Sequence, residues 1–118
     1  MSQESAGGIY RRGDVVLVPM DFTDRSGSKV RPAAVVSTEE YNDGPDVLIV
    51  SITSNQEPLP HPGDHRIKEW KAAGLLKPSL AQTKLATVEA SMIRRKLGEL
   101  DAADMTSIED GLRKALGL

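Results

Sequence analysis

Short runs of apolar residues, separated by polar segments that contain glycine or proline, dominate the first hundred positions of the chain. Each run has the length of a strand and is rich in aliphatic and β-branched side chains, which is typical of β-structure. The run Val47–Val50 has no polar interruption, which favours a strand buried on both faces. The pattern predicts strands at 9–20, 31–38, 46–53, 64–67, 79–86 and 91–97.

The segments between these strands carry residues that end regular structure. Residues 55–63 hold three prolines and one glycine, so we expect a loop there. A strong break at 42–45, Asn-Asp-Gly-Pro, limits 39–44 to a short helical turn or a loop. Residues 69–76 are expected to form either a helical turn or a loop that buries Trp70.

The C-terminal segment has a different period and is predicted to be a helix. Asp101 is a favoured N-cap, Asp104 adds negative charge to the first turn, and Gly117 suits a left-handed end. Apolar residues spaced three and four apart form one stripe at Met105, Ile108, Leu112 and Leu116. Many short strands followed by a terminal helix predict an α+β, mainly β fold or a small barrel. We expect a flexible tail over 1–8 and a single domain over 9–118.

The composition narrows the possible chemistry. The chain has no cysteine, which excludes disulfides and thiolate chemistry, and its two histidines lie on either side of Pro62-Gly63, so no metal site is expected. With 15 basic and 17 acidic residues the net charge is −2, so a nucleic-acid site would have to be a local patch. No apolar run approaches the roughly 20 residues that span a bilayer, and no hydrophobic signal core is present. We expect a cytoplasmic protein with no membrane partner.

A long polar stretch, 21–29, separates the first two predicted strands. It is longer than the about two to five residues of an ordinary hairpin loop, and long loops on a strand scaffold often carry function. The second strand opens with Arg31-Pro32, and the proline biases Arg31 towards an extended conformation. Arg31 is therefore expected at the beginning of a strand, beside the loop, where its planar guanidinium suits a phosphate.

Three segments, in their order and spacing, resemble the MazF/PemK (Kid) family of toxin endoribonucleases: Arg-Gly-Asp-Val at 12–15, Ser-Gly-Ser-Lys at 26–29 and Arg-Pro-Ala-Ala-Val-Val-Ser at 31–37. A fourth, Val-Ser-Ile-Thr-Ser at 50–54, is similar to the family's apolar strand that ends in threonine. The resemblance extends over about 11–118. It implies an SH3-like β-barrel with a C-terminal helix, the fold of the MazF, Kid and CcdB toxins. It also implies a homodimer that needs no cofactor and is inhibited by a cognate antitoxin.

The resemblance further implies a reaction. The 2′-hydroxyl of single-stranded RNA attacks the adjacent phosphorus without a metal, at short specific sequences, and leaves a 2′,3′-cyclic phosphate and a 5′-hydroxyl. Such a reaction needs a proton acceptor, a proton donor and stabilisation of charge on the phosphoryl oxygens. The family's catalytic pair corresponds here to Arg31 and Thr53, whose guanidinium and hydroxyl suit those oxygens.

Further RNA contacts are expected around this pair. The long loop would close over the RNA with small polar and basic side chains on phosphates, and a glutamine on a late strand would contact a base or a phosphate. The expected RNA-binding residues are Ser26, Ser28, Lys29, Ser54 and Gln82. Phe22, in the same loop, either stacks on a base or plugs the core.

The chain departs from the family immediately before Gln82, where several relatives carry a charged residue proposed as acid or base and this chain has Ala81. The sequence leaves open whether Asp64, His65 or Arg66 takes that part. It also leaves open a degenerate homologue that binds RNA without cutting it. A CcdB-like gyrase poison of the same fold is another alternative, although the C-terminal Ala-Leu-Gly-Leu lacks the Trp-Gly-Ile associated with that group.

Overall fold

The computed structural model of the protein describes residues 9–21, 28–55 and 61–118, so the expected tail and Phe22 lie outside the described residues. The elements follow one another as β1 Asp14–Asp21, β2 Ser28–Val35, α1 Glu39–Asn42, β3 Asp46–Thr53, β4 His65–Arg66, β5 Leu80–Glu89, the 3₁₀ helix η2 Ala90–Met92, β6 Arg95–Glu99 and α2 Ala102–Leu116. None of these helices is long and apolar enough to cross a membrane.

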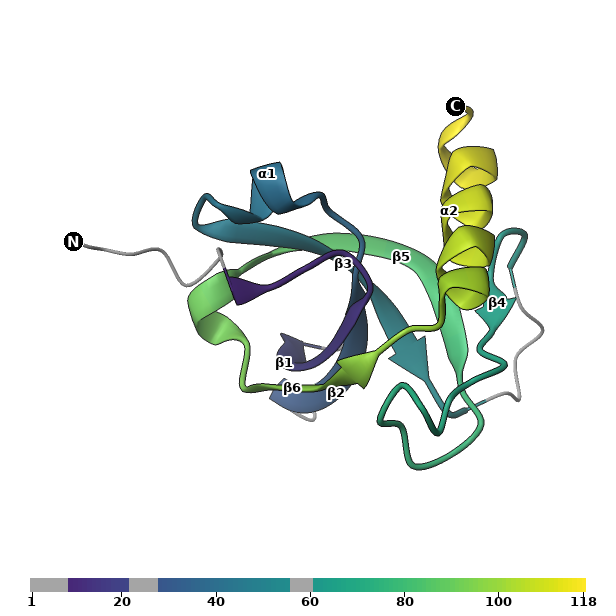
Figure 1. Ribbon diagram of the computed structural model, residues 1–118, viewed down its shortest axis with the longest axis horizontal. Helices are drawn as coiled ribbons and strands as arrows, with labels where there is room; N and C mark the ends of the chain where they lie inside the picture. The colour runs from purple at the N-terminus through teal and green to yellow at the C-terminus, as the bar shows by residue number, and fades with distance from the viewer. Residues whose placement is uncertain (1–8, 22–27, 56–60) are drawn as a thin grey trace.

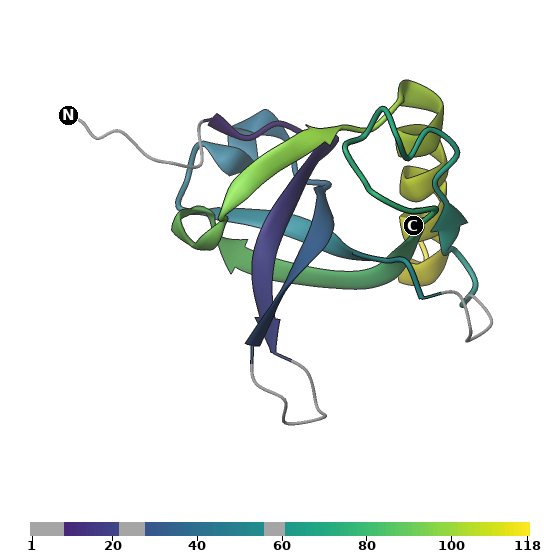
Figure 2. The same ribbon diagram turned by 90° about the horizontal axis from the view of Figure 1, so that it is seen from below.

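The strands form one antiparallel sheet in the order β4-β5-β3-β2-β1-β6. The sheet curls into a half-barrel, and α2 stands at one side of it next to β4 (Figures 1 and 2). This arrangement confirms the predicted mainly β fold with a C-terminal helix. Because β3 lies in the middle of the order, both of its edges are paired and its two faces are free to bury side chains.

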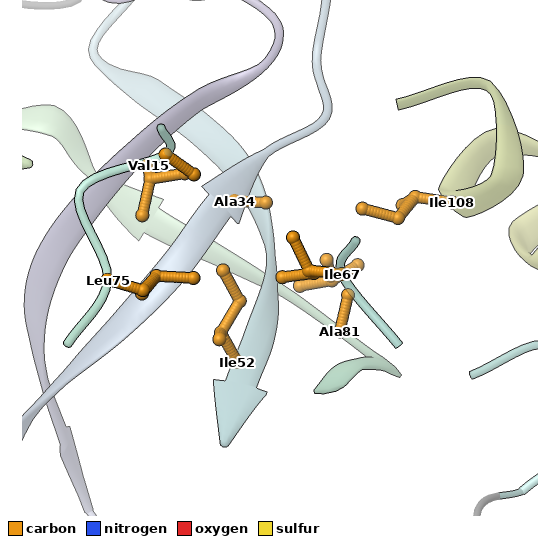
Figure 3. Close-up of a cluster of buried hydrophobic side chains, with 9 residues drawn as sticks. Val15, Ala34, Ile52, Ile67, Leu75, Ala81 and Ile108 are labelled. Carbon is orange, nitrogen blue, oxygen red and sulfur yellow. The ribbon is translucent and has the colours of Figure 1, made fainter. Parts of the chain in front are cut away.

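Two clusters of buried apolar side chains lie on the two faces of the central strands. Val47 and Ile49 of β3 belong to one cluster, and Val50 and Ile52 belong to the other. The second cluster gathers side chains from β1, β2, β5, α2 and the segment that connects β4 to β5, among them Leu75 (Figure 3). The continuous apolar run at 47–50 is therefore explained by burial on both faces, as predicted.

Backbone contacts through glycine hold the segment between β3 and β5 against the rest of the fold. Gly63 has a φ of +94°, and a Cβ added there would lie 2.7 Å from the carbonyl oxygen of Gly111 in α2. Gly74 has a φ of +84°, and a Cβ added there would overlap the carbonyl oxygen of Leu97 in β6. The lack of a side chain at both positions lets the connecting segment pack directly on α2 and β6.

The start of β2 differs from the prediction. The strand begins at Ser28 rather than Arg31, and Lys29 pairs with Met20 of β1. Both ends of the predicted loop at 21–29 therefore belong to the paired strands, and the connection is shorter than predicted. Pro32 lies inside the strand, opposite Leu17. The ladder between β2 and β3 begins only at Ala33, so Pro32 occupies a stretch paired on one side, where a strand tolerates proline.

Other boundaries of helices and strands also differ from the prediction. The predicted strand at 79–86 continues to Glu89 because Asp46 and its neighbours extend the β3–β5 ladder, and the strand predicted at 91–97 is displaced to β6 by the turn of η2. The segment 69–76 forms a hydrogen-bonded turn, in which the N–H of Ala73 donates to the carbonyl of Glu69 and Gly74 has a left-handed φ of +84°, and it packs Trp70 against the core. It therefore combines the two predicted alternatives, a helical turn that ends near Gly74 and a segment that buries Trp70. The N-cap at Asp101 and the left-handed end at Gly117 are confirmed. Leu116 is exposed, so the apolar stripe of α2 is shorter than predicted.

Candidate RNA-cleavage site

Arg31 and Thr53 lie on neighbouring strands at the same end of the sheet. In the β2–β3 ladder Ala33 pairs with Ser51, and continuing this antiparallel register by two residues places Arg31 opposite Thr53. Side chains two residues apart in a strand share a face. Arg31 therefore shares a face with Ala33, and Thr53 shares the same face with Ser51. The predicted pair is brought together by the pairing of two central strands.

A pocket of about 240 Å³ opens at this end of the sheet, and we call it the polar hollow. Its lining includes Met20, Arg31, Ser51, Thr53, Gln82 and Lys84. These residues come from β1, β2, β3 and β5, which are consecutive in the sheet order. The polar hollow is thus a continuation of the sheet face that is buried further along the strands, at a place where polar residues replace the apolar ones.

The hydroxyl of Thr53 is oriented by the residue that follows the strand. Its Oγ1 accepts a hydrogen bond from the backbone N–H of Asn55 at 3.1 Å. A threonine hydroxyl has one hydrogen to donate in addition to its lone pairs. The contact with Asn55 uses a lone pair, so the hydroxyl hydrogen is left to donate to an acceptor in the hollow.

A second pocket, of about 330 Å³, lies beside the first and shares Arg31, Ile52 and Thr53 with it. We call it the apolar hollow. Its further lining residues include Leu17, Pro32, Leu75, Leu76, Lys77, Arg95 and Leu97. Arg31 and Thr53 therefore stand at the boundary between two adjoining hollows of different character.

The charged side chains among the described lining residues of both hollows are all basic, although the whole chain is slightly acidic. The polar hollow carries Arg31 and Lys84, and the apolar hollow carries Arg31, Lys77 and Arg95. No Asp, Glu or His is among the described residues that line either of them. The net charge of −2 therefore conceals a local concentration of cations at one end of the sheet, which is the form of basic patch that an anionic ligand requires.

The other predicted site residues fall in different places. Gln82 lines the polar hollow, and Ser54 lines the apolar hollow. Lys29 is exposed on β2 and lines neither of them. Ser28 is the first residue of β2. Ser26 lies outside the described residues.

Two of the three residues considered as substitutes for the missing acid or base are held elsewhere by structural contacts. Asp64 accepts hydrogen bonds from both the N–H and the hydroxyl of Thr83, at 2.8 and 3.1 Å. The ring of His65 lies 2.7 Å from a carboxylate oxygen of Asp104. Neither these residues nor Arg66, which is exposed on β4, line the two hollows. The described residues also contain no group of three or more His, Asp and Glu side chains that could hold a metal ion.

Several lining residues were not predicted from the sequence. Ser51 and Lys84 each lie two positions from a predicted residue, Thr53 and Gln82, so the two-residue period of a strand would have pointed to both. The residues from the segment before β5 and from β6 carry no such signal, because their place in the apolar hollow depends on tertiary packing. Those residues are Leu75, Leu76, Lys77, Arg95 and Leu97.

A family model of PemK-like, MazF-like toxins of type II toxin–antitoxin systems matches residues 11–116. The chain belongs to this family. The predicted resemblance is thereby confirmed.

Solved structures share the fold of this toxin-family chain. An endoribonuclease in complex with its cognate antitoxin, from a mycobacterial species, is 23% identical with a TM-score of 0.75, over 92% of this chain and 96% of that chain. MazE-MazF from Deinococcus radiodurans is 17% identical with a TM-score of 0.75, over 93% and 97% of the two chains. The toxin MazF-mt6 of Mycobacterium tuberculosis is 19% identical with a TM-score of 0.71, over 89% and 97%. No curated protein sequence matches the chain.

Proposed function

We propose that the protein is a toxin endoribonuclease that cuts single-stranded RNA at short specific sequences, without a metal ion. The observation that carries the proposal is the placement of Arg31 and Thr53 on adjacent strands, at the boundary of two cation-lined hollows. Structures of the same fold that are described as endoribonucleases support this reading. RNA rather than DNA is the substrate because the attacking group is the 2′-hydroxyl.

In the proposed reaction the 2′-oxygen forms a bond to the adjacent phosphorus, and the bond from phosphorus to the 5′-oxygen breaks. The proton of the 2′-hydroxyl is lost to a base, and the departing 5′-oxygen gains a proton. The products are a 2′,3′-cyclic phosphate and a 5′-hydroxyl. The guanidinium of Arg31 and the hydroxyl of Thr53 donate hydrogen bonds to the non-bridging oxygens, where negative charge accumulates in the transition state.

The other lining residues of the polar hollow hold the RNA strand in place. Lys84 supplies a second cation for a phosphate. Gln82 and Asn55 carry amide groups, which can both donate and accept hydrogen bonds with a base edge. Ser28 and Lys29 at the start of β2, Ser26 before it and Ser54 after Thr53 remain predicted RNA contacts. Sequence preference is assigned to the amide groups, because phosphate contacts carry no base information.

The partners follow from the same site. We propose that a cognate antitoxin inhibits the protein by covering the hollows, as a segment with acidic side chains would complement Arg31, Lys77 and Lys84. Solved structures of this fold include complexes that are described as containing an antitoxin. We further propose that the protein works in the cytoplasm as a homodimer.

The test is cleavage of a long single-stranded RNA in the presence of EDTA, with mapping of the product ends. We expect discrete cuts by wild type, and losses of about 10²–10³-fold for Arg31→Ala and Thr53→Ala, as for removal of one oxyanion donor. Arg113→Ala and Thr106→Ala are the matched controls, since both residues are exposed on α2.

Three results would contradict the proposal in different ways. Activity that requires a divalent cation would remove the metal-independent mechanism. Cutting that survives both substitutions would place the catalytic pair elsewhere. No cutting of any RNA by folded wild type would favour action by protein binding, for which gyrase inhibition is the first assay.

A further inference from the structure

The apolar hollow has a wall whose position is fixed by the core. Leu75 is 7% exposed and packs in the same cluster as Ile52, towards which its side chain points in Figure 3. The next residue, Leu76, is 93% exposed and lines the apolar hollow. One leucine thus anchors the segment while its neighbour is presented at the surface, because consecutive side chains leave the backbone in different directions.

Contacts between backbones hold this wall against β6. A Cβ added at Gly74 would overlap the carbonyl oxygen of Leu97, and one added at Gly98 would lie 2.5 Å from the carbonyl oxygen of Ala73. The backbone N–H of Leu75 also donates to the carbonyl of Trp70 at 3.0 Å. The turn and the strand therefore touch without intervening side chains, and Leu76 is carried on a preorganised support rather than on a free loop.

The rest of the lining combines apolar and cationic groups. Leu17, Pro32 and Leu97 complete the apolar part, and Lys77 and Arg95 add positive charge. No acidic side chain is among the described lining residues. Leu76 adds apolar surface to this cationic lining, and a ligand that covers this surface gains free energy of binding from its burial. The lining suits a ligand that has a flat apolar body and a negative charge attached to it.

We propose that the apolar hollow holds the nucleobase of a nucleotide next to the scissile phosphate, packed against Leu76. This inference rests on the proposed function, because it takes the scissile phosphate to lie on Arg31 and Thr53. Those two residues belong to both hollows, so an RNA strand whose phosphate sits on them sends one neighbouring nucleotide into each.

The two hollows then treat their nucleotides differently. The polar hollow offers amide and hydroxyl groups, and it distinguishes bases by hydrogen bonds. The apolar hollow offers carbon surface and cations, and it holds any base by contact, with Lys77 and Arg95 on the flanking phosphates. The cut should therefore show strict base preference on one side and tolerance on the other.

The experiment uses short RNAs built around a mapped cut site, with an abasic residue on one or the other side of the cleaved bond. For wild type we expect the abasic residue on the tolerant side to lower kcat/KM by about tenfold, the range for lost apolar contact in a pocket. Leu76→Ala should lower kcat/KM for the intact RNA by a similar factor and should leave the abasic RNA unaffected. Leu118→Ala, which removes a leucine that is 84% exposed and lies outside both hollows, is the matched control.

The decisive quantity is the difference between the effects of Leu76→Ala on kcat/KM for the intact RNA and for the abasic RNA. Equal losses by Leu76→Ala on intact and abasic RNA overturn the inference, and so does an unchanged rate. If Leu76→Ala weakens inhibition by an acidic antitoxin peptide, or shifts the oligomeric state measured by sedimentation, and leaves cleavage intact, the occupant is a peptide or a second copy and the inference falls.

A second measurement separates this inference from the proposed function. Non-cleavable 2′-O-methyl RNA with 4-thiouridine at random positions is irradiated with the full-length protein, and the cross-linked residues are mapped by mass spectrometry. Cross-links at Leu75–Lys77 support the inference even when native RNA is not cut. Wild type that cuts RNA without cross-links or base–Leu76 coupling retains the proposed function and loses only the apolar subsite. Absence of both cutting and cross-linking overturns both.

Discussion

The ring nitrogen Nε2 of His65 lies 2.7 Å from Oδ1 of Asp104, which joins β4 to the first turn of α2 across 39 residues of sequence. The same carboxylate accepts hydrogen bonds from the backbone N–H groups of Lys68 and Glu69, at 2.9 and 3.0 Å. The carboxylate is 1% exposed. It therefore fixes the beginning of the connecting segment that later supplies the wall of the apolar hollow.

Asp104→Ala should lower the free energy of unfolding by about 3 kcal/mol, because three donors lose a buried charged acceptor. Urea unfolding followed by circular dichroism measures the change. Asp110→Ala is the matched control: Asp110 is an exposed acid on the same helix, and its loss should change stability by less than about 0.5 kcal/mol. Equal effects of the two substitutions would show that the buried contacts contribute nothing beyond helix charge.

The same carboxylate gives the stability a defined pH dependence. Burial alone would raise the pKa of Asp104, but the hydrogen bonds from His65, Lys68 and Glu69 outweigh burial and lower it. A carboxyl that releases its proton more readily when folded stabilises the protein above its unfolded pKa, about 3.9. That stabilisation is lost as the pH falls through the lower pKa of the folded state.

Urea unfolding of wild type and Asp104→Asn between pH 7 and pH 2 tests this dependence. The difference in the free energy of unfolding should shrink as the pH falls below about pH 5, where the unfolded carboxyl takes up its proton first. A difference that stays constant down to pH 2 would show that the charge of Asp104 is not what stabilises the contact with β4.

The sequence predicted Asp101 and Gly117 as the ends of α2 because caps depend on neighbouring residues alone. For Asp104, only a favourable charge in the first turn was predicted from the sequence. The burial of Asp104 depends on Lys68 and Glu69, which arrive from a distant segment with no periodic pattern. The helix could be predicted from neighbouring residues alone, whereas the burial of one of its acidic side chains, Asp104, depends on tertiary packing.

The same distinction applies to the site. The bounds of β3 were predicted correctly because the apolar run Val47–Val50 continues with alternating polar and apolar residues to Thr53, and the strand order then set Thr53 beside Arg31. The apolar hollow was not predicted, because it depends on the approach of Gly74 to Leu97. A glycine read in sequence indicates a possible turn, and it does not reveal which backbone will lie against it.

Gly111→Ala should destabilise the protein, although alanine favours a helix over glycine by about 1 kcal/mol in an exposed position. A Cβ on residue 111 would overlap the carbonyl oxygen of Gly63, which is backbone and cannot turn away. Overpacking of this kind costs about 1–3 kcal/mol, so the sign of the ordinary helix effect should reverse.

Thermal unfolding provides the measurement, with Thr106→Ala as the matched control because Thr106 is exposed on the same helix. The midpoint should fall for Gly111→Ala and should stay the same or rise for Thr106→Ala. A rise for both would mean that the loop at Gly63 does not pack on α2.

Thr53 offers a pair of substitutions that separates its hydroxyl from its shape. Thr53→Val keeps the β-branched outline in a strand and removes the hydroxyl, whereas Thr53→Ser keeps the hydroxyl and removes a methyl group. If the hydroxyl donates to the phosphoryl oxygens, Thr53→Val should lower kcat by about 10²-fold and Thr53→Ser should lower it by less than about tenfold.

Multiple-turnover cleavage of a short RNA at saturating concentration measures kcat, and single-turnover cleavage with saturating protein in excess over the RNA measures the chemical step without product release. The unfolding midpoint is compared for the two variants, because Thr53 Oγ1 also accepts the N–H of Asn55. Equal losses of kcat in the two variants would assign Thr53 to packing alone. A loss in Thr53→Val that appears only in KM would place the hydroxyl in substrate binding, since a contact that is equally strong in the ground state and the transition state does not raise kcat.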